Sequence, residues 1–138
     1  MPAKDFYHET VRNALIRDGW TITHDPYTLA YGLRKVFVDL GAERTLAAEK
    51  GGRKIAVEIK SFRGQSDLRD LENALGQYVV YRSLLARVEP DRELFLAVPG
   101  DAFESTLTDP IARPPLEDLE VRLFVFEAAE GRIIRWTS

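Results

Sequence analysis

The sequence contains no cysteine, only two histidines and a single methionine. Without cysteine there can be no disulfide bond and no thiolate metal site. Two histidines are too few for a zinc site built from histidine alone, so oxygen atoms are the better candidate ligands for a metal. No apolar run is long enough to cross a membrane, and the opening residues MPAKD lack the apolar stretch of a signal peptide. These absences predict a cytoplasmic protein without membrane contact.

Charged residues are plentiful but unevenly distributed along the chain. The net charge of −3 argues against a protein that coats nucleic acid indiscriminately. Residues 1–69 have a balance of +3 and contain every lysine, whereas residues 70–138 have a balance of −6. The first half is therefore compatible with a local basic surface, although lysines scattered over a helix and a hairpin would give the same count.

Hydrophobic spacing predicts an α/β protein, a mixed sheet with helices packed on it, in a single domain over residues 1–138. Helices are expected at 5–18, from the N-cap Ser66 to Pro90, and at 101–107. Strands are expected at 20–23, 34–40, 44–50, 54–60, 93–98, 121–126 and 132–136. Gly51-Gly52 and Glu130-Gly131 are the expected hairpin turns, and the prolines at 110, 114 and 115 indicate a loop.

The strand expected at 54–60 carries the first candidate chemistry. Its alternation places Ile55, Val57 and Ile59 in the core, and Glu58 and Lys60 on the opposite face. A carboxylate and an ammonium two residues apart can bind a divalent cation and orient a water beside it, as phosphodiester hydrolysis requires. An isolated Glu-x-Lys, however, is more often just the solvated face of an amphipathic strand.

A second carboxylate is available at two positions. Asp39 follows an apolar run, and the register of the expected hairpin gives its side chain the same parity as Glu58. On a straight strand Asp39 would overshoot Glu43 by roughly 13 Å, so it requires a bend or bulge near Gly41. Without that bend, Glu43 is the better second carboxylate, unless it is simply a cross-strand partner for Lys60.

Gln77 and Tyr81 lie four residues apart and hence on one face of the long helix expected after this strand. An amide above a pair of carboxylates can position a phosphate or a metal-bound water. On its own, the pair is better explained by a core tyrosine and a glutamine without a special role. Glu9, in the first helix, is a weaker candidate, and the adjacent His8 is better explained as a packing or surface residue.

In combination, these residues resemble the motif of the PD-(D/E)xK nuclease superfamily. The motif would comprise Asp39, then Glu58-Ile59-Lys60, then Gln77 with Tyr81, the last pair as in RecB-like members. Val38 stands where the motif usually has proline. The resemblance implies a restriction-endonuclease-like fold.

The same resemblance implies a role for each motif residue. Asp39, Glu58 and the backbone carbonyl of Ile59 would bind Mg²⁺ or Mn²⁺. Lys60 would orient the attacking water or stabilise developing negative charge, and Gln77 would be an accessory ligand or position the water.

A closer resemblance covers almost the whole chain. It rests on DGW at 18–20, VDLGAE at 38–43, IAVEIKSF at 55–62, ALGQY at 74–78 and LAVP at 96–99. These segments are similar to the XisH family, the fdxN element excision controlling factors of cyanobacteria. The resemblance implies a role in DNA excision together with a site-specific recombinase and a small partner, XisI.

Two kinds of activity are compatible with this family. One is metal-dependent hydrolysis of DNA, for which a homodimer is expected by analogy with nucleases that cut two strands. The alternative is a non-catalytic accessory that keeps the nuclease fold and docks a recombinase or an XisI-type partner. The acidic balance of the chain fits such protein binding better than tight DNA binding.

Overall fold

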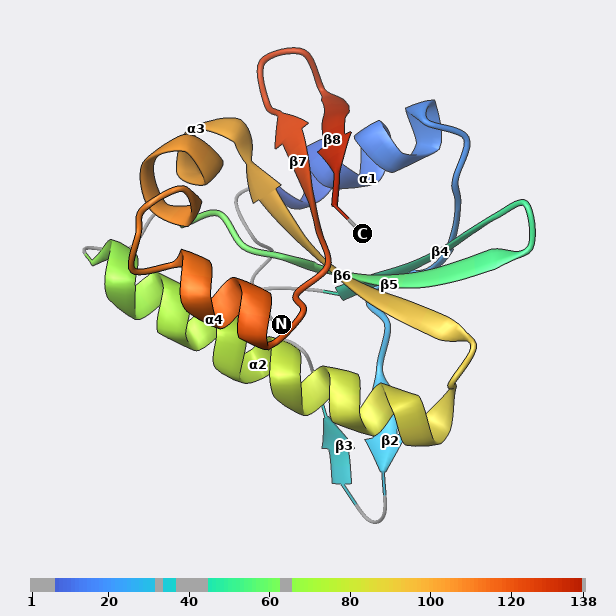
Figure 1. The fold of residues 1–138 in the computed structure, drawn as a ribbon. Helices are drawn as coiled ribbons and strands as arrows, with labels where there is room; N and C mark the ends of the chain where they lie inside the picture. Colours follow the sequence, from blue (N-terminus) through green and yellow to red (C-terminus); the bar gives the residue numbers. More distant parts are fainter. Residues whose placement is uncertain (1–6, 32–33, 37–44, 63–65, 138) are drawn as a thin grey trace.

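The computed structural model describes residues 7–31, 34–36, 45–62 and 66–137 (Figure 1). The helices are α1 (His8–Arg17), α2 (Asp67–Val88), α3 (Gly100–Ala102) and α4 (Arg113–Asp118), with a π-helical turn η1 (Phe103–Leu107) directly after α3. The strands are β1 (Thr21–His24), β2 (Leu29–Tyr31), β3 (Arg34–Val36), β4 (Thr45–Lys50), β5 (Arg53–Ile59), β6 (Arg92–Pro99), β7 (Leu123–Glu127) and β8 (Arg132–Trp136). Within these ranges, no helix is long and apolar enough to span a membrane.

A six-stranded mixed sheet in the order β1-β4-β5-β6-β7-β8 forms the centre of the structure. The central strands β5, β6 and β7 run parallel to one another, and the outer pairs β1–β4, β4–β5 and β7–β8 are antiparallel. Strands β2 and β3 form a separate two-stranded sheet. The mixed sheet and its helices confirm the predicted α/β class.

Helices cover both faces of the sheet, so that it divides two hydrophobic cores. On one face, Val11 and Leu15 of α1 pack with Ile55, Val57 and Ile59 of β5. On the other face, Ala56 of β5 packs with the buried side chains of α2. Figure 1 shows α1 behind the sheet and α2 with α4 on the opposite side. Alternate residues of β5 therefore enter different cores, and both cores are closed to water.

Local sequence signals explain where β5 and α2 begin. Gly51 and Gly52 both have positive φ, +55° and +82°, as a tight hairpin turn between β4 and β5 requires. That turn sets the predicted register, in which Thr45 lies opposite Glu58. At the start of α2, the Ser66 side chain accepts a hydrogen bond of 3.2 Å from the backbone N–H of Arg69, which confirms it as the N-cap.

The region rich in proline differs from the prediction, because part of the expected loop is the helix α4. Pro114 and Pro115 lie in its first turn, where the backbone N–H groups have no partner within the helix. Proline therefore starts this helix rather than preventing it. Strand β2 was also not expected from the sequence, and of the strand expected at 34–40 only β3 lies among the described residues.

Candidate functional site

The candidate site lies at the carboxyl end of β5. Glu58 is the second-last residue of this strand, and Lys60 follows its last residue. The backbone N–H of Lys60 donates a hydrogen bond of 3.0 Å to the carbonyl of Ala97 on β6, so Lys60 is still held to the sheet. The carboxyl ends of parallel strands are the edge at which α/β proteins most often bind ligands.

Both charged side chains are buried, so the interpretation of this face as solvated is wrong. Glu58 is 0% exposed and Lys60 is 7% exposed. They share the face of β5 that α2 covers, because they have the same parity as Ala56. Burying a charge is costly unless the charge is paired, so the two side chains need close polar partners.

Lys60 connects the strand to the helix. Its Nζ lies 4.0 Å from Oε1 of Glu58 and donates a hydrogen bond to Oε1 of Gln77, which belongs to α2. At this distance, two unit charges attract one another by about 4 kcal/mol at an effective dielectric constant near 20, before the cost of desolvation. The ammonium is thus held between a carboxylate from the sheet and an amide from the helix.

Tyr81 lies one turn after Gln77 on α2 and is 2% exposed. Its position on the same helical face agrees with the predicted spacing. The tyrosine belongs to the core on the α2 side of the sheet, together with Tyr78. Both tyrosines are thus buried on the side of α2 that faces the sheet, next to Gln77.

The other candidate residues are distributed as follows. Asp39 and Glu43, the two alternatives for a second carboxylate, both lie outside the described residues. Glu9 is exposed in the first turn of α1, which packs on the opposite face of the sheet. Among the described residues, no group of three or more His, Cys, Asp or Glu side chains is placed to hold a metal ion.

Two oxygen atoms at the end of β5 could contribute to a cation site. They belong to the carboxylate of Glu58 and the main-chain carbonyl of Ile59, both oxygen donors of the kind that Mg²⁺ and Mn²⁺ prefer. Lys60 adds a fixed positive charge that can attract an anionic phosphate group. The described residues thus supply one carboxylate and one carbonyl oxygen at this place, and a complete cation site would need further ligands.

A second buried polar cluster was not expected from the sequence. His8 of α1 is 1% exposed, and its Nε2 lies 2.9 Å from Oδ1 of Asp25, while Arg12 Nη1 donates a hydrogen bond of 2.5 Å to Oδ2 of the same carboxylate. Burial raises the pKa of Asp25, but the hydrogen bonds and charges of His8 and Arg12 outweigh it, so that the pKa falls below 3.8. The cluster joins α1 to the turn after β1. Asp25 lies 17 residues from His8 and 13 from Arg12, too far for a local signal to pair them.

Comparison with known proteins decides the family. The model of the XisH protein family matches residues 1–134. The chain belongs to the XisH family.

Two solved structures have a similar fold along nearly their whole length. A fdxN element excision controlling factor protein from Anabaena variabilis is 37% identical, with a TM-score of 0.88, over 96% of this chain and 98% of that chain. An XisH family protein from Nostoc punctiforme is 33% identical, with a TM-score of 0.89, over 97% of this chain and 100% of that chain. No curated protein matches this XisH chain. The family assignment therefore rests on the whole length of the chain rather than on a short motif.

Proposed function

We propose that this XisH protein is a metal-dependent endodeoxyribonuclease with a restriction-endonuclease-like fold, acting in DNA excision. The single observation that supports this most directly is the buried contact of Lys60 with Glu58 and Gln77 at the carboxyl end of β5. A buried acid and amine are costly for stability alone, and apolar residues of similar volume would often serve stability as well. Their presence in the interior is explained if they act on a substrate.

The cation would be Mg²⁺ or Mn²⁺, held by Glu58, the carbonyl of Ile59 and Asp39. When bound, such a cation stabilises charge on phosphate oxygens and acidifies water. Lys60, held by Glu58 and Gln77, places a positive charge where negative charge develops during hydrolysis. Gln77 fixes the direction of the ammonium and offers an amide that can orient the attacking water.

The assignment to DNA excision comes from the relatives. The similar protein from Anabaena variabilis is described as a fdxN element excision controlling factor. The partners proposed for this chain are DNA, a site-specific recombinase and an XisI-type protein. A homodimer would place two such sites on the two strands of a duplex.

The test is DNA cleavage by the purified protein with Mg²⁺ or Mn²⁺, on supercoiled, nicked, branched and single-stranded DNA. Cleavage should disappear with EDTA and in the variants Glu58→Gln and Lys60→Ala. Lys54→Ala is the matched control, since Lys54 lies on the same face of β5 but at its other end. Cleavage that persists in Glu58→Gln at wild-type rates, or no cleavage of any substrate by the wild type, would contradict catalysis at this site.

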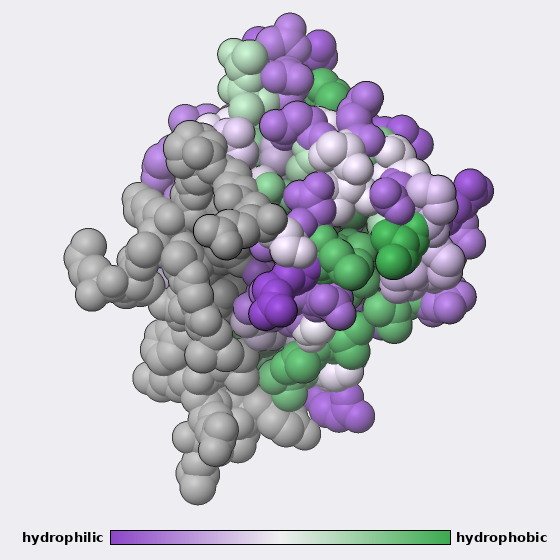
Figure 2. Space-filling model, turned by 90° about the vertical axis from the view of Figure 1, so that its left-hand side faces the viewer, coloured by the Kyte–Doolittle hydropathy of each residue, from purple (hydrophilic) through white to green (hydrophobic). Residues whose placement is uncertain are grey.

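A second candidate function, a non-catalytic accessory that docks a protein partner, is supported by the surface in Figure 2. On this side of the molecule, where α2 begins, hydrophobic side chains gather between hydrophilic ones. The first turn of α2 and the turn before α4 carry Leu68, 46% exposed, and Ile111, 59% exposed. Apolar side chains that gather on one side of a molecule can mark a site of protein–protein contact.

Co-purification with an XisI-type protein tests this alternative. Leu68→Glu and Ile111→Glu should weaken the complex, whereas Val88→Glu, at the exposed far end of α2, should not. A complex together with absent metal-dependent cleavage would favour the accessory role. A complex insensitive to both substitutions would place the contact elsewhere.

A further inference from the structure

A second concave site lies on the other face of the sheet, at the opposite end of β5 from Lys60. It is a pocket of about 660 Å³ between the end of α1, the β4–β5 turn, the start of β6 and the end of β8. Its lining includes the aromatic residues Trp20, Phe95 and Trp136, and the cations Lys50, Arg53 and Arg122. Neither the family assignment nor the proposed hydrolysis gives this pocket a role.

The apolar part of the pocket is an aromatic cluster. The ring centroids of Trp136 and Trp20 are 5.8 Å apart, and Phe95 meets Trp136 edge-on at 5.1 Å. Trp20 is 5% exposed, and its indole N–H has no hydrogen-bond partner within the part of the chain that the structure describes. A buried donor without an acceptor is uncommon in folded proteins, so this one is a reason to look for a ligand.

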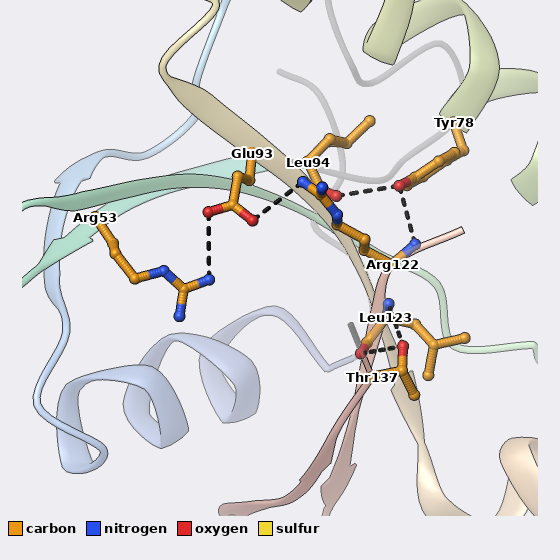
Figure 3. A network of polar contacts seen from close by, with 7 residues as sticks. All are labelled: Arg53, Tyr78, Glu93, Leu94, Arg122, Leu123 and Thr137. Atoms are coloured by element: carbon orange, nitrogen blue, oxygen red, sulfur yellow. Dashed lines mark hydrogen bonds and ion pairs between the residues drawn. The ribbon is translucent and has the colours of Figure 1, made fainter. Parts of the chain in front are cut away.

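In the polar part of the pocket, cationic side chains outnumber acidic ones. Arg53 Nη2 and Arg122 Nη1 lie 3.3 Å and 3.0 Å from the two carboxylate oxygens of Glu93, so that one acid serves two guanidinium groups (Figure 3). Lys50 lies 3.8 Å from Asp18. With three cations against two acids, the lining has a net charge of +1 in a chain whose net charge is −3.

The main chain of Arg122 is anchored in the core. Its backbone N–H donates a hydrogen bond of 3.0 Å to the hydroxyl of Tyr78, which in turn donates one of 3.2 Å to the carbonyl of Leu94 (Figure 3). The side chain itself is 47% exposed, and its guanidinium is held in the pocket lining by its ion pair with Glu93. Preorganised groups bind with a smaller entropic cost.

We propose that this pocket binds a nucleotide. The phosphate would take up hydrogen bonds from Arg53 and Arg122, whose planar guanidinium groups match phosphate oxygens. The base would pack against Trp136, the half-buried member of the aromatic cluster, because Trp20 and Phe95 are buried and Arg53 already lies over the Trp20 ring. The nucleotide is either free or part of a nucleic acid strand, since both present the same base and phosphate.

The combination of features selects this ligand class. A small inorganic anion would contact only the cationic side chains of the pocket, and an apolar ligand would contact only the aromatic cluster. The volume of about 660 Å³ is in the range of pockets that take small organic ligands and exceeds what one ion needs. A nucleotide uses both parts at once.

Binding can be followed in the full-length protein by tryptophan fluorescence, because the only two tryptophans of the chain, Trp20 and Trp136, both line this pocket. The protein is titrated in EDTA with dAMP, with 2′-deoxyadenosine, with inorganic phosphate and with a short oligodeoxynucleotide. We expect saturable quenching by dAMP and binding about tenfold weaker for 2′-deoxyadenosine, which lacks only the charged group. An oligonucleotide that binds at least tenfold more tightly than dAMP would identify a strand as the source, and equal affinities a free nucleotide.

Substitutions of the arginines that line the pocket distinguish binding at this site from a general effect of the protein's charge. Arg53→Gln and Arg122→Gln should each weaken dAMP binding about tenfold, and Glu93→Gln should strengthen it, because it removes the acid that competes for both guanidinium groups. Arg113→Gln, an exposed arginine paired with Glu117 on α4, is the matched control. The proposal would be overturned if neither dAMP nor the oligonucleotide gave saturable quenching. It would also be overturned if the quenching were unchanged in both Arg53→Gln and Arg122→Gln. Because EDTA removes divalent cations, the titration does not depend on the metal-dependent hydrolysis proposed at Glu58.

Discussion

Lys60 and Glu58 form an ion pair that is buried under α2, with Nζ 4.0 Å from Oε1. The two residues are neighbours on one face of β5, and the amide of Gln77 contacts the same ammonium from the helix. This one contact joins the sheet to the helix that covers it. It bears on stability whether or not the site is catalytic.

Replacing Lys60 by methionine should destabilise the protein markedly. The substitution keeps the volume of the side chain but leaves the carboxylate of Glu58 buried without its cation, which typically costs about 3–5 kcal/mol. The free energy of unfolding in urea measures the loss. The double variant Glu58→Gln/Lys60→Met should lose less than the sum of the two single variants, whereas strictly additive losses would show that the pair is not coupled.

A divalent cation should stabilise the folded protein through Glu58. A ligand that binds only the native state raises its stability by about 2.7 kcal/mol at one hundred times its Kd. We therefore expect Mn²⁺ to raise the Tm of the wild type and of Lys54→Ala but not of Glu58→Gln. Equal shifts in all three proteins would mean that the cation binds elsewhere.

Stability should fall in alkaline solution because of Tyr27. Burial, together with the hydrogen bond that its hydroxyl donates to Glu89, raises the pKa of Tyr27 from 10.0 to about 12. The folded protein thus holds this proton more tightly than the unfolded chain. The resulting stability is complete below pH 10 and is lost as the pH rises towards 12.

The variant Tyr27→Phe isolates this effect from the titration of lysines over the same range. At neutral pH it should be less stable than the wild type by about 1 kcal/mol, the usual contribution of a hydrogen bond. The difference should shrink between pH 10 and 12. A difference independent of pH across this window would rule out the phenol as its source.

In acid, protonation of Asp25 should lower the stability of the folded protein. Its pKa is lowered below 3.8 by the hydrogen bonds and charges of His8 and Arg12, which outweigh the effect of burial. The folded state therefore favours the ionised carboxylate. The stability from Asp25 is present above pH 3.8 and is lost as the pH falls through the lowered pKa.

Asp25→Asn should lower the free energy of unfolding by about 2 kcal/mol at neutral pH, as for a hydrogen bond to a charged group. The gap to the wild type should close in strong acid. Asp18→Asn, at an exposed ion pair with Lys50, is the control and should change stability little at any pH. A gap that stays constant in acid would contradict the role of the Asp25 carboxylate.

Features set by neighbouring residues were predictable from the sequence. Gly51 and Gly52 fix a tight turn, and the turn fixes which residues of β4 and β5 face each other. Ser66 satisfies an N–H at the start of α2 and so sets where that helix begins. Each of these signals acts over a few residues.

Features that depend on long-range packing were not predictable in this way. The alternation of β5 places Glu58 opposite the apolar residues, but it does not say that α2 covers that face. The contact of Lys60 with Gln77 was reached through a family motif, and only the fold brings the two together across 17 residues. No local sequence pattern predicts the cluster of Arg53, Glu93 and Arg122. Glu93 is 40 residues from Arg53 and 29 residues from Arg122.

The two cores lie on opposite faces of the sheet, and this restricts the register in which β5 can pair with its neighbours during folding. If this strand slipped by one residue against its neighbours, every side chain would exchange faces. Glu58 would then enter the core in which Phe124 and Phe126 pack, and Ile59 would take its place beneath α2. Lys60 would move to that core with Glu58, and the pair would lose the amide of Gln77, which stays on α2. Because a buried ion pair without other polar partners is costly among aromatic rings, Glu58 and Lys60 together disfavour the misaligned form.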